Sequence, residues 1–385
     1  MARKFLVPKT VWLGQDALQS AQMDICSLGG KALIVSGQSM IRQGYMKMLT
    51  DMLDQNRLAW VIYSDISGEP TDQMIEKGAA VYMENKCDFI IGFGGGSPLD
   101  SAKAIGVLAV CGGKISDYMG KEITTALPPV VAIPTTAGTG SEVTQFTIIT
   151  DTATDVKMLL KGNSLIPAVA VVDPVFTLQA TESVTVAAGL DALTHAVEAY
   201  TSKKAYDQSD RYALSAVKRI FKYLPLVLQE PSNIVHREEM STAAYEAGVS
   251  FSNSSVTLVH GMSRPIGALF HVPHGISNAM LLDVCLSFAA QGASELFGNL
   301  ARVIGEAEDT DNDWEAANKF LKSLKNLCIT CHVPTLAEYG IDKNAFLEQA
   351  DKMAGDAVAS GSPSNTRRET GKDEIKELYY KLWEN

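Results

Sequence analysis

Short apolar runs alternate with helical segments through the first half of the chain, and this alternation constrains the fold more than any other feature. The predicted strands are residues 31–36, 60–63, 88–93, 129–133 and 168–173. Between them, residues 41–53 and 71–85 have the apolar spacing of amphipathic helices. Strands that alternate with helices are typical of an open α/β sheet.

The pattern changes near residue 182, beyond which strand-like runs nearly vanish. Long segments with helical periodicity then follow one another, at residues 183–202, 208–224, 237–252, 276–291, 293–305, 314–327 and 373–382. We therefore predict an α/β N-terminal domain over residues 1–182 and an all-helical C-terminal domain over residues 183–385. A chain of 385 residues is long enough for two domains of ordinary size.

Composition and charge argue against several classes of protein. Hydrophobic residues make up 46% of the chain and charged residues 20%, which suits a well-packed soluble protein. A net charge of -11 argues against a nucleic-acid partner, because phosphate contacts need a basic surface. No apolar run approaches the roughly 20 residues that span a bilayer, so no membrane partner is expected. The first residues do not resemble a secretory signal, and six scattered cysteines favour the reducing cytoplasm.

Two loops rich in glycine and hydroxyl side chains each follow a predicted strand. The first contains Gly94, Gly95, Gly96, Ser97 and Asp100, and it opens a helix. The second runs from Ile133 to Thr144 and contains Thr135, Thr136 and Thr139. Glycines let a backbone approach a phosphate, and a helix start offers it free N–H groups. A tight turn alone would explain the first loop, but two such loops together predict a dinucleotide site in a Rossmann-like sheet.

Histidines cluster strongly in a chain that has only six of them. Asp191 and His195 are separated by one turn of a predicted helix, so both lie on one helical face. His260 and His274 bracket a later segment that also contains His271. A surface i,i+4 pair and two structural histidines would explain these residues separately. A mononuclear metal centre explains them jointly, in the cleft between the domains where ligand pockets are common.

Taken together, these segments resemble the iron-containing (group III) alcohol dehydrogenase family. The resemblance rests on motifs that occur in the family's order and spacing: Gly94–Asp100, Pro134–Glu142, Asp191…His195, His260…His274 with Phe270-His-Val-Pro-His-Gly275, and Ser362–Arg367. It extends from the N-terminus nearly to the end of the chain.

The resemblance implies a cofactor, a metal and an assembly. Asp191, His195, His260 and His274 would ligate Fe²⁺, or Zn²⁺ as in some members. NAD or NADP would be bound by Gly95, Gly96, Ser97, Asp100, Thr135, Thr136, Thr144 and Lys157. His271 would lie near the metal and the nicotinamide. It would relay a proton or contact the substrate there, or alternatively it would serve in packing or in a hydrogen bond to a ligand. Family members are usually dimers or larger homo-oligomers.

The ligand set agrees with this chemistry. Hydride transfer from an alcohol requires alkoxide character on its oxygen, and a metal with an open position lowers the pKa of the alcohol. Three imidazoles and one carboxylate suit Fe²⁺, Zn²⁺, Ni²⁺ or Mn²⁺ by ligand softness. The sequence therefore leaves the identity of the metal open.

Two positions depart from the family pattern. Many members have a histidine four residues after the third metal ligand, where this chain has Arg264. A guanidinium there favours a substrate with a carboxylate, sulfonate or phosphonate, unless Arg264 forms an ion pair with a nearby acid. The second departure is at the end of the first predicted strand, where Gly37 replaces the aspartate of many NAD-preferring relatives. Without that carboxylate, NADP is tolerated in principle.

We therefore predict a metal- and NAD(P)-dependent enzyme that interconverts a short-chain primary alcohol and its aldehyde. Arg264 and His271 are its candidate catalytic-site residues, and an anionic aldehyde held by Arg264 is one candidate substrate. A dehydrogenase for neutral short-chain alcohols or diols is the first alternative. A lyase similar to the dehydroquinate synthases and a metal-free reductase or binding protein are further alternatives.

Overall fold

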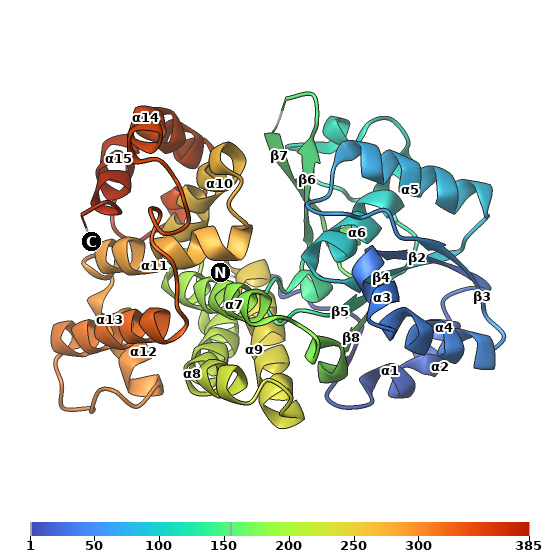
Figure 1. The fold of residues 1–385 in the computed structure, drawn as a ribbon, viewed down its shortest axis with the longest axis horizontal. Coiled ribbons are helices and arrows are strands. Elements are labelled where there is room, and N and C mark those ends of the chain that lie inside the picture. The colour runs from blue at the N-terminus through green and yellow to red at the C-terminus, as the bar shows by residue number, and fades with distance from the viewer. Residues whose placement is uncertain (1, 155, 385) are drawn as a thin grey trace.

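The computed structural model describes residues 2–154 and 156–384. Six parallel strands form the sheet of the N-terminal domain, in the order β1-β8-β5-β4-β2-β3 (Figure 1). These strands are β1 (Thr10–Leu13), β2 (Lys31–Ser36), β3 (Ala59–Tyr63), β4 (Phe89–Gly94), β5 (Val130–Pro134) and β8 (Val169–Val172). Five of them lie where the sequence predicted strands, and β1 adds an edge strand that was not predicted.

Helices cover both faces of this sheet because its strands are apolar on both sides. They are α1 (Ala17–Ser20), α2 (Gln22–Cys26), α3 (Gln38–Arg42), α4 (Tyr45–Gln55), α5 (Asp72–Glu84) and α6 (Gly96–Cys111). On β2, Ile34 packs with the cluster that contains Leu49 of α4. Its neighbour Val35 points the other way and packs with the cluster that contains Ile105 of α6.

Two further features of the N-terminal domain differ from the prediction. The helix expected over residues 41–53 is two helices, α3 and α4, because Gly44 between them has a φ of 80°. Strands β6 (Phe146–Asp151) and β7 (Val156–Lys161) form an antiparallel hairpin that was not predicted. This hairpin contacts the helical domain through β7 and rises beside it in Figure 1.

The C-terminal domain is helical, as predicted. Its helices are α7 (Glu182–Thr201), α8 (Asp207–Gln229), α9 (Ile234–Asn253), α10 (Leu258–Phe270), α11 (His274–Ala290), α12 (Ser294–Val303), α13 (Asp313–Thr330), α14 (Lys343–Ala359) and α15 (Lys372–Lys381). Two of these, α10 and α14, were not among the predicted helical segments. Pro265 interrupts the helical pattern of α10, and α14 buries several alanines, which give a weak hydrophobic signal.

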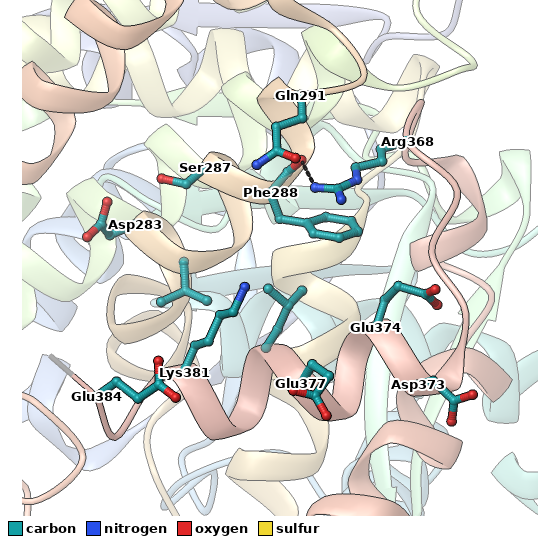
Figure 2. Close-up of a pocket in the computed structure, with 12 residues that line it drawn as sticks. Asp283, Ser287, Phe288, Gln291, Arg368, Asp373, Glu374, Glu377, Lys381 and Glu384 are labelled. Carbon is teal, nitrogen blue, oxygen red and sulfur yellow. Dashed lines mark hydrogen bonds between the residues drawn. The ribbon is translucent and has the colours of Figure 1, made fainter.

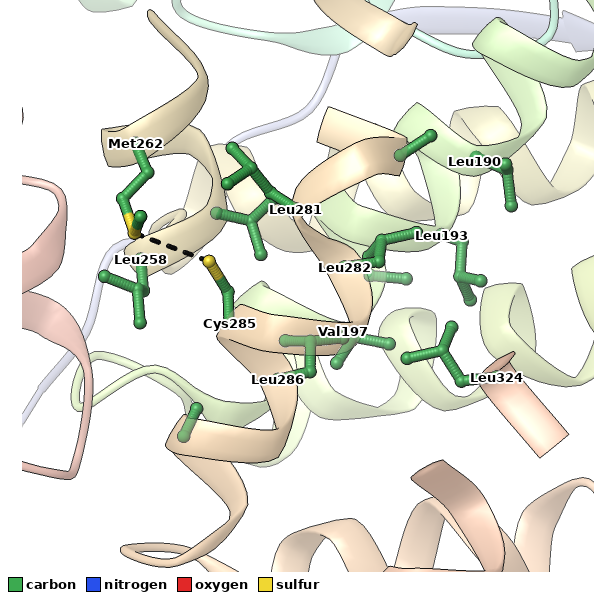
Figure 3. Packing of buried hydrophobic residues seen from close by; sticks show 14 of the residues in the cluster. Leu190, Leu193, Val197, Leu258, Met262, Leu281, Leu282, Cys285, Leu286 and Leu324 are labelled. Carbon is green, nitrogen blue, oxygen red and sulfur yellow. Dashed lines mark hydrogen bonds between the residues drawn. The ribbon is translucent and has the colours of Figure 1, made fainter. Parts of the chain in front are cut away.

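Helix α7 forms the centre of the helical domain. Every residue from Gly189 to Thr201 is buried, which is expected of a helix surrounded by other helices. Figure 3 shows Leu193 and Val197 of α7 beside Leu282 of α11 in this core. Nearby, the Cys285 thiol donates to the sulfur of Met262 at 3.5 Å. Such complete packing holds the polar residues of α7 in fixed positions. No helix among the described residues is long and apolar enough to cross a bilayer.

Candidate metal centre and cofactor site

Three acidic or imidazole side chains follow one face of α7. Asp191, His195 and Glu198 occupy positions i, i+4 and i+7, and all three are buried. The Thr181 hydroxyl accepts the Val184 N–H at 3.3 Å and caps the start of this helix. The helix thus presents a row of polar groups inside an otherwise apolar domain.

The other two predicted ligands come from different helices and approach the Asp191 carboxylate. His260 lies in the first turn of α10, and His274 is the first residue of α11. The Nε2 atoms of His260 and His274 each lie 3.7 Å from Asp191 Oδ1. His195 Nδ1 lies 3.9 Å from Asp191 Oδ2. One possible ligand atom from each of Asp191, His195 and His260 lies within 4.8 Å of the others.

A buried carboxylate orients His260. Glu198 accepts the His260 Nδ1–H at 2.6 Å, and it also accepts the Thr257 hydroxyl at 2.8 Å and the Thr257 N–H at 3.0 Å. Burial raises the pKa of Glu198, but these hydrogen bonds outweigh it, so the pKa lies below its ordinary value. An ionised Glu198 keeps the proton on Nδ1 and leaves the Nε2 lone pair of His260 toward Asp191.

Two other imidazoles are held neutral. Burial lowers the pKa of His195 to about 4 and that of His274 to about 3. His195 Nδ1 is buried and has no hydrogen-bond partner among the described residues. The His195 ring stacks on Phe251 with the ring centroids 4.1 Å apart. Neutral imidazoles with free lone pairs are the form that binds a divalent metal.

Asn278 connects three of the four predicted ligands. It lies one turn after His274 on α11, and its Nδ2 donates to Asp191 Oδ1 at 2.7 Å. The same Nδ2 lies 3.2 Å from His274 Nε2 and 3.4 Å from His260 Nε2. An unpartnered imidazole nitrogen, oriented lone pairs and one carboxylate fit a divalent transition metal at this point.

A cavity of about 400 Å³ joins this cluster to the two predicted phosphate loops. Its lining includes Asp191, His195, His260 and His274 from the cluster and Gly96, Asp100, Thr139 and Thr144 from the loops. A smaller hollow of about 160 Å³ adjoins Asp100 and His274 and is also lined by Ser97 and Lys157. The loops predicted to bind a dinucleotide and the residues predicted to bind a metal therefore face one space.

The two loops fit closely against each other. Strand β4 ends at Gly94, and α6 begins at Gly96. A Cβ on Gly96 would lie 2.8 Å from Cγ2 of Thr139, so no larger residue fits there without moving the second loop. A Cβ on Gly95 would lie 3.6 Å from Thr136, and the Thr135 N–H donates to the Gly94 carbonyl at 2.9 Å. Gly95, Gly96 and Ser97 are only partly buried, so the N-terminus of α6 is open to a phosphate.

Buried charges hold the second loop onto α6. Asp100 accepts the Ser141 hydroxyl at 2.5 Å and the Ile148 N–H at 2.9 Å. Lys103 donates to the carbonyls of Thr144 and Phe146 at 3.0 and 2.9 Å. Burial lowers the pKa of Lys103 to about 8 and raises that of the nearby Glu142 to about 7. Asp100 and Thr144 thus have structural partners in addition to their place on the cavity wall.

Comparison with known sequences agrees with this architecture. The model for the N-terminal part of the iron-containing alcohol dehydrogenases matches residues 8–174, and the model for the C-terminal part of this family matches residues 185–383. The chain belongs to the iron-containing alcohol dehydrogenase family. An NAD-dependent methanol dehydrogenase of Bacillus methanolicus is 34% identical over 372 residues, which cover 96% of this chain and 97% of that protein.

Solved structures of this family have the same fold. A 1,3-propanediol oxidoreductase superposes with a TM-score of 0.95 at 32% identity, covering 99% of this chain and 100% of that one. A sulfoacetaldehyde reductase from Bifidobacterium kashiwanohense, in complex with NAD⁺, superposes with a TM-score of 0.86 at 27% identity. That alignment covers 99% of both chains.

Other residues predicted from the family resemblance lie in varied surroundings. Lys157 forms an ion pair with Glu69 at 2.8 Å and faces the smaller hollow. Gly37 pairs through its backbone with Asp65, and a Cβ there would lie 2.9 Å from the Ile66 carbonyl oxygen. His271 ends α10 with a φ of 54° and is exposed, three residues before His274. Their roles in cofactor binding and catalysis remain predictions.

Arg264, the departure from the family pattern, lines both hollows. It is partly buried, and its Nη1 donates to the Ser362 hydroxyl at 3.3 Å. Among the described residues, no carboxylate oxygen lies within the 4.0 Å of an ion pair. The predicted alternative of a direct ion pair is therefore not found among these residues, although the charge of the buried Glu198 partly offsets the effect of burial on the pKa of Arg264.

Sequence reasoning missed several polar residues of the site. Glu198 lies three residues after His195 on the same helical face, so its spacing could have identified it. Asn278 lies one turn after His274 and could have been identified in the same way. Lys103 and Glu142 gave no such signal, because their association depends on how two separate loops pack.

A second large hollow lies away from this site, between α11 and α15 (Figure 2). Its volume is about 510 Å³, and the residues that line it include none of the predicted site residues. Arg368 donates to the Phe288 carbonyl at 3.1 Å, and its guanidinium carbon lies 3.7 Å from the centroid of the Phe288 ring. Most of its charged lining residues are acidic, so this hollow does not resemble a nucleotide site.

Proposed function

We propose that this chain interconverts a short-chain primary alcohol and its aldehyde by hydride transfer with NAD(P)(H), and that the substrate carries an anionic group held by Arg264. One observation carries this proposal. A single cavity is lined by the four predicted metal ligands, by the two glycine- and threonine-rich loops and by an arginine with no counter-ion among the described residues. The family comparison supports the alcohol dehydrogenase chemistry.

Asp191, His195, His260 and His274 would hold the metal, for which Fe²⁺ is the family's choice and Zn²⁺ the alternative. When bound, a divalent metal acts as a Lewis acid that favours the alkoxide form of the alcohol and polarises the carbonyl of the aldehyde. Glu198 and Asn278 keep the ligand atoms oriented. The buried surroundings of His195 exclude water from the ligands on that side.

The two loops would bind the dinucleotide. Gly94, Gly95, Gly96 and Ser97 leave room for its pyrophosphate at the start of α6, and Thr135, Thr136, Thr139 and Thr144 supply hydroxyls and backbone amides. A dinucleotide bound there would supply the hydride acceptor for oxidation of the alcohol, which also releases the hydroxyl proton. Proton relay through His271 remains part of this proposal. NAD is supported by the named relatives, and the absence of an aspartate at Gly37 leaves NADP open.

The anionic substrate follows from the charge on Arg264. A guanidinium stays protonated throughout the physiological pH range, although burial lowers its pKa here. A partly buried cation that forms no direct ion pair is stabilised by an anionic ligand. The sulfoacetaldehyde reductase among the structural relatives acts, by its name, on an anionic aldehyde. The methanol dehydrogenase relative favours the alternative of a neutral alcohol.

The test compares wild-type enzyme with Arg264→Leu, after anaerobic reconstitution with Fe²⁺ or Zn²⁺. Matched anionic and neutral short-chain aldehydes are reduced with NADH or NADPH. We expect KM for the anionic aldehyde to rise roughly 30-fold or more, the equivalent of about 2 kcal/mol, while KM for the neutral aldehyde changes little. Arg264→Lys is the control, since it keeps the charge and loses the planar fork.

Equal effects on both aldehydes would return Arg264 to a structural role and favour the neutral-alcohol alternative. If the wild-type enzyme reduced none of the aldehydes in a metal-dependent reaction, the dehydrogenase proposal itself would be contradicted. The lyase alternative would then be favoured. We further propose that the protein is cytoplasmic and forms a homodimer or larger homo-oligomer. Light scattering on the purified enzyme measures its assembly state.

A further inference from the structure

Hydroxyl and ammonium groups line the same cavity as Arg264. Besides Arg264, the lining includes Lys161, Lys204 and, from the helical domain, four serines: Ser254, Ser255, Ser360 and Ser362. The carboxylates in this lining are Asp191, in the metal cluster, and Asp100, which accepts two hydrogen bonds within the α/β domain. The other charged side chains of the lining, Lys161, Lys204 and Arg264, are therefore cations.

The four serine hydroxyls differ in whether they donate a hydrogen bond to the protein. Ser254 donates to the carbonyls of Ser250 and Ala199, and Ser360 donates to the carbonyl of Ala357 at 2.6 Å. These two hydroxyls have their protons engaged by the backbone.

The other two hydroxyls are acceptors. Ser255 Oγ accepts the Asn365 side-chain amide at 2.9 Å, and Ser362 Oγ accepts Arg264 Nη1 at 3.3 Å. Within the described residues, neither hydroxyl has an acceptor for its own proton. Because their lone pairs are engaged by N–H groups, both serines remain able to donate to a ligand in the cavity.

Residues 360–367 hold these donors in place. Gly361 turns the chain with a φ of 74°, and Ser362 is buried. Arg367 donates to the carbonyls of Thr201 and Ser202, at the end of α7, at 3.2 Å each. Asn365 is fixed by the Val256 carbonyl as well as by Ser255. The segment is therefore tied to the helix that carries two of the predicted metal ligands.

We propose that the anionic group of the substrate is a tetrahedral oxyanion, a sulfonate or a phosphonate, and that Ser255 and Ser362 select it over a planar carboxylate. This inference rests on the proposed function. The two oxygens of a carboxylate lie in one plane and are satisfied by the N–H fork of an arginine. A third oxygen points out of that plane and needs further donors, which Ser255 and Ser362 supply.

Two lysines favour the same class of ligand. Lys161 and Lys204 are exposed where they line the cavity, and neither forms an ion pair with a described residue. Lys161 Nζ lies 5.9 Å from the centroid of the Phe146 ring, which also lines the cavity. With Arg264, these residues place three positive charges on the wall of one cavity.

The test uses metal-reconstituted enzyme and four alcohols of similar size: 2-hydroxyethanesulfonate, 2-hydroxyethylphosphonate, 3-hydroxypropanoate and propan-1-ol. We expect the wild type to prefer one or both tetrahedral anions over 3-hydroxypropanoate. In Ser255→Ala/Ser362→Ala, kcat/KM for the preferred tetrahedral anion should fall about 10- to 100-fold, as expected for lost hydrogen bonds to a charged group. For 3-hydroxypropanoate and propan-1-ol it should fall less than about threefold, since neither needs the third set of donors. The sulfonate and phosphonate arms identify which anion is used.

Ser254→Ala is the matched control. Its hydroxyl lines the same cavity, but its proton is engaged by backbone carbonyls, so the ratio of sulfonate or phosphonate to carboxylate turnover should not change. Calorimetric titration of the same proteins with ethanesulfonate and propanoate measures anion binding without turnover. The single variants Ser255→Ala and Ser362→Ala replace the double variant if it does not fold.

The two proposals fail in different ways. A wild-type enzyme that prefers propan-1-ol, or an Arg264→Leu variant that loses anionic and neutral substrates alike, would overturn the proposed function. An enzyme that prefers anions but uses 3-hydroxypropanoate as well as the tetrahedral anions would overturn only this inference. Serine variants that lower kcat/KM equally for all three anionic substrates would also overturn only this inference.

Discussion

Glu198 determines which nitrogen of His260 is available, although it is not itself one of the predicted ligands. It accepts the Nδ1 proton at 2.6 Å and has three further hydrogen bonds that fix its own position. A carboxylate behind a ligating histidine both orients the ring and raises its basicity. We therefore regard Glu198 as a positioning residue for the proposed metal centre.

Replacing Glu198 with glutamine should weaken metal binding about 10- to 100-fold, because the amide no longer enforces the Nδ1–H tautomer. Competition with a chelator measures the Zn²⁺ affinity, and the visible spectrum of the Co²⁺ form reports the ligand geometry. Glu182→Gln is the control, since it makes the same change at an exposed position in the first turn of α7. An affinity within about twofold of the wild type would show that Glu198 acts only in packing.

At the same scale, sequence reasoning succeeded where residues share a helix or a short motif. The spacing of Asp191 and His195 predicted that both would lie on one face, and α7 places them there. Glu198 was overlooked in the same row because a glutamate on a helix usually faces solvent. Only the burial of α7 on all sides makes that carboxylate part of the site.

For helices and strands too, sequence reasoning succeeded where the pattern is local and failed where the structure depends on packing. Buried parallel strands were predicted because they are continuous apolar runs of the length of a strand. The β6–β7 hairpin was not, since its strands mix exposed and buried residues and form no continuous apolar run. Helix α10 contains Pro265, and its helical form depends on packing against α11 and α14, which no local pattern reveals.

The contact between α6 and the second loop leads to a prediction for cofactor binding. Gly96→Ala would place a Cβ 2.8 Å from Thr139 and push that loop away from the start of α6. We expect Kd for NADH to rise about 10-fold or more, since a displacement of this size removes at least one hydrogen bond to a charged phosphate. The change in nicotinamide fluorescence when NADH is titrated with the enzyme measures this Kd.

Gly106→Ala provides the control on the same helix. A Cβ there would meet Ile90 and Pro128 at 3.7 Å, an ordinary contact distance. Alanine in a helix interior is more stable than glycine by roughly 0.5–1 kcal/mol, so this variant should unfold at the same or a higher temperature. If both variants bound NADH like the wild type, the loop contact would have no role in cofactor binding.

For the whole molecule, the sign of the charge differs between the protein and its cavity. The chain has a net charge of -11, yet Lys161, Lys204 and Arg264 all line the cavity. A local positive field within a negative protein attracts anions to one place and repels them elsewhere. Composition could not predict this arrangement, because the three residues come from β7, from the turn after α7 and from α10.

This charge distribution predicts a salt effect that depends on the substrate. Raising ionic strength from about 0.01 to 0.3 M shortens the Debye length from about 30 Å to less than 8 Å. We expect kcat/KM for an anionic aldehyde to fall severalfold over this range, while kcat/KM for a neutral aldehyde stays constant. Lys161→Gln/Lys204→Gln should reduce the salt dependence. An equal response of both aldehydes would instead indicate an effect of salt on the cofactor or on the protein.

The placement of the site also bears on how such an enzyme diversifies. The four predicted metal ligands lie on helices, whereas Ser255 and residues 360–367 lie in connections between helices. Connections tolerate substitution and changes in length far better than a helix that is buried on all sides. New substrate ranges can therefore arise, or be engineered, by exchanging two short segments while the hydride-transfer machinery is inherited unchanged.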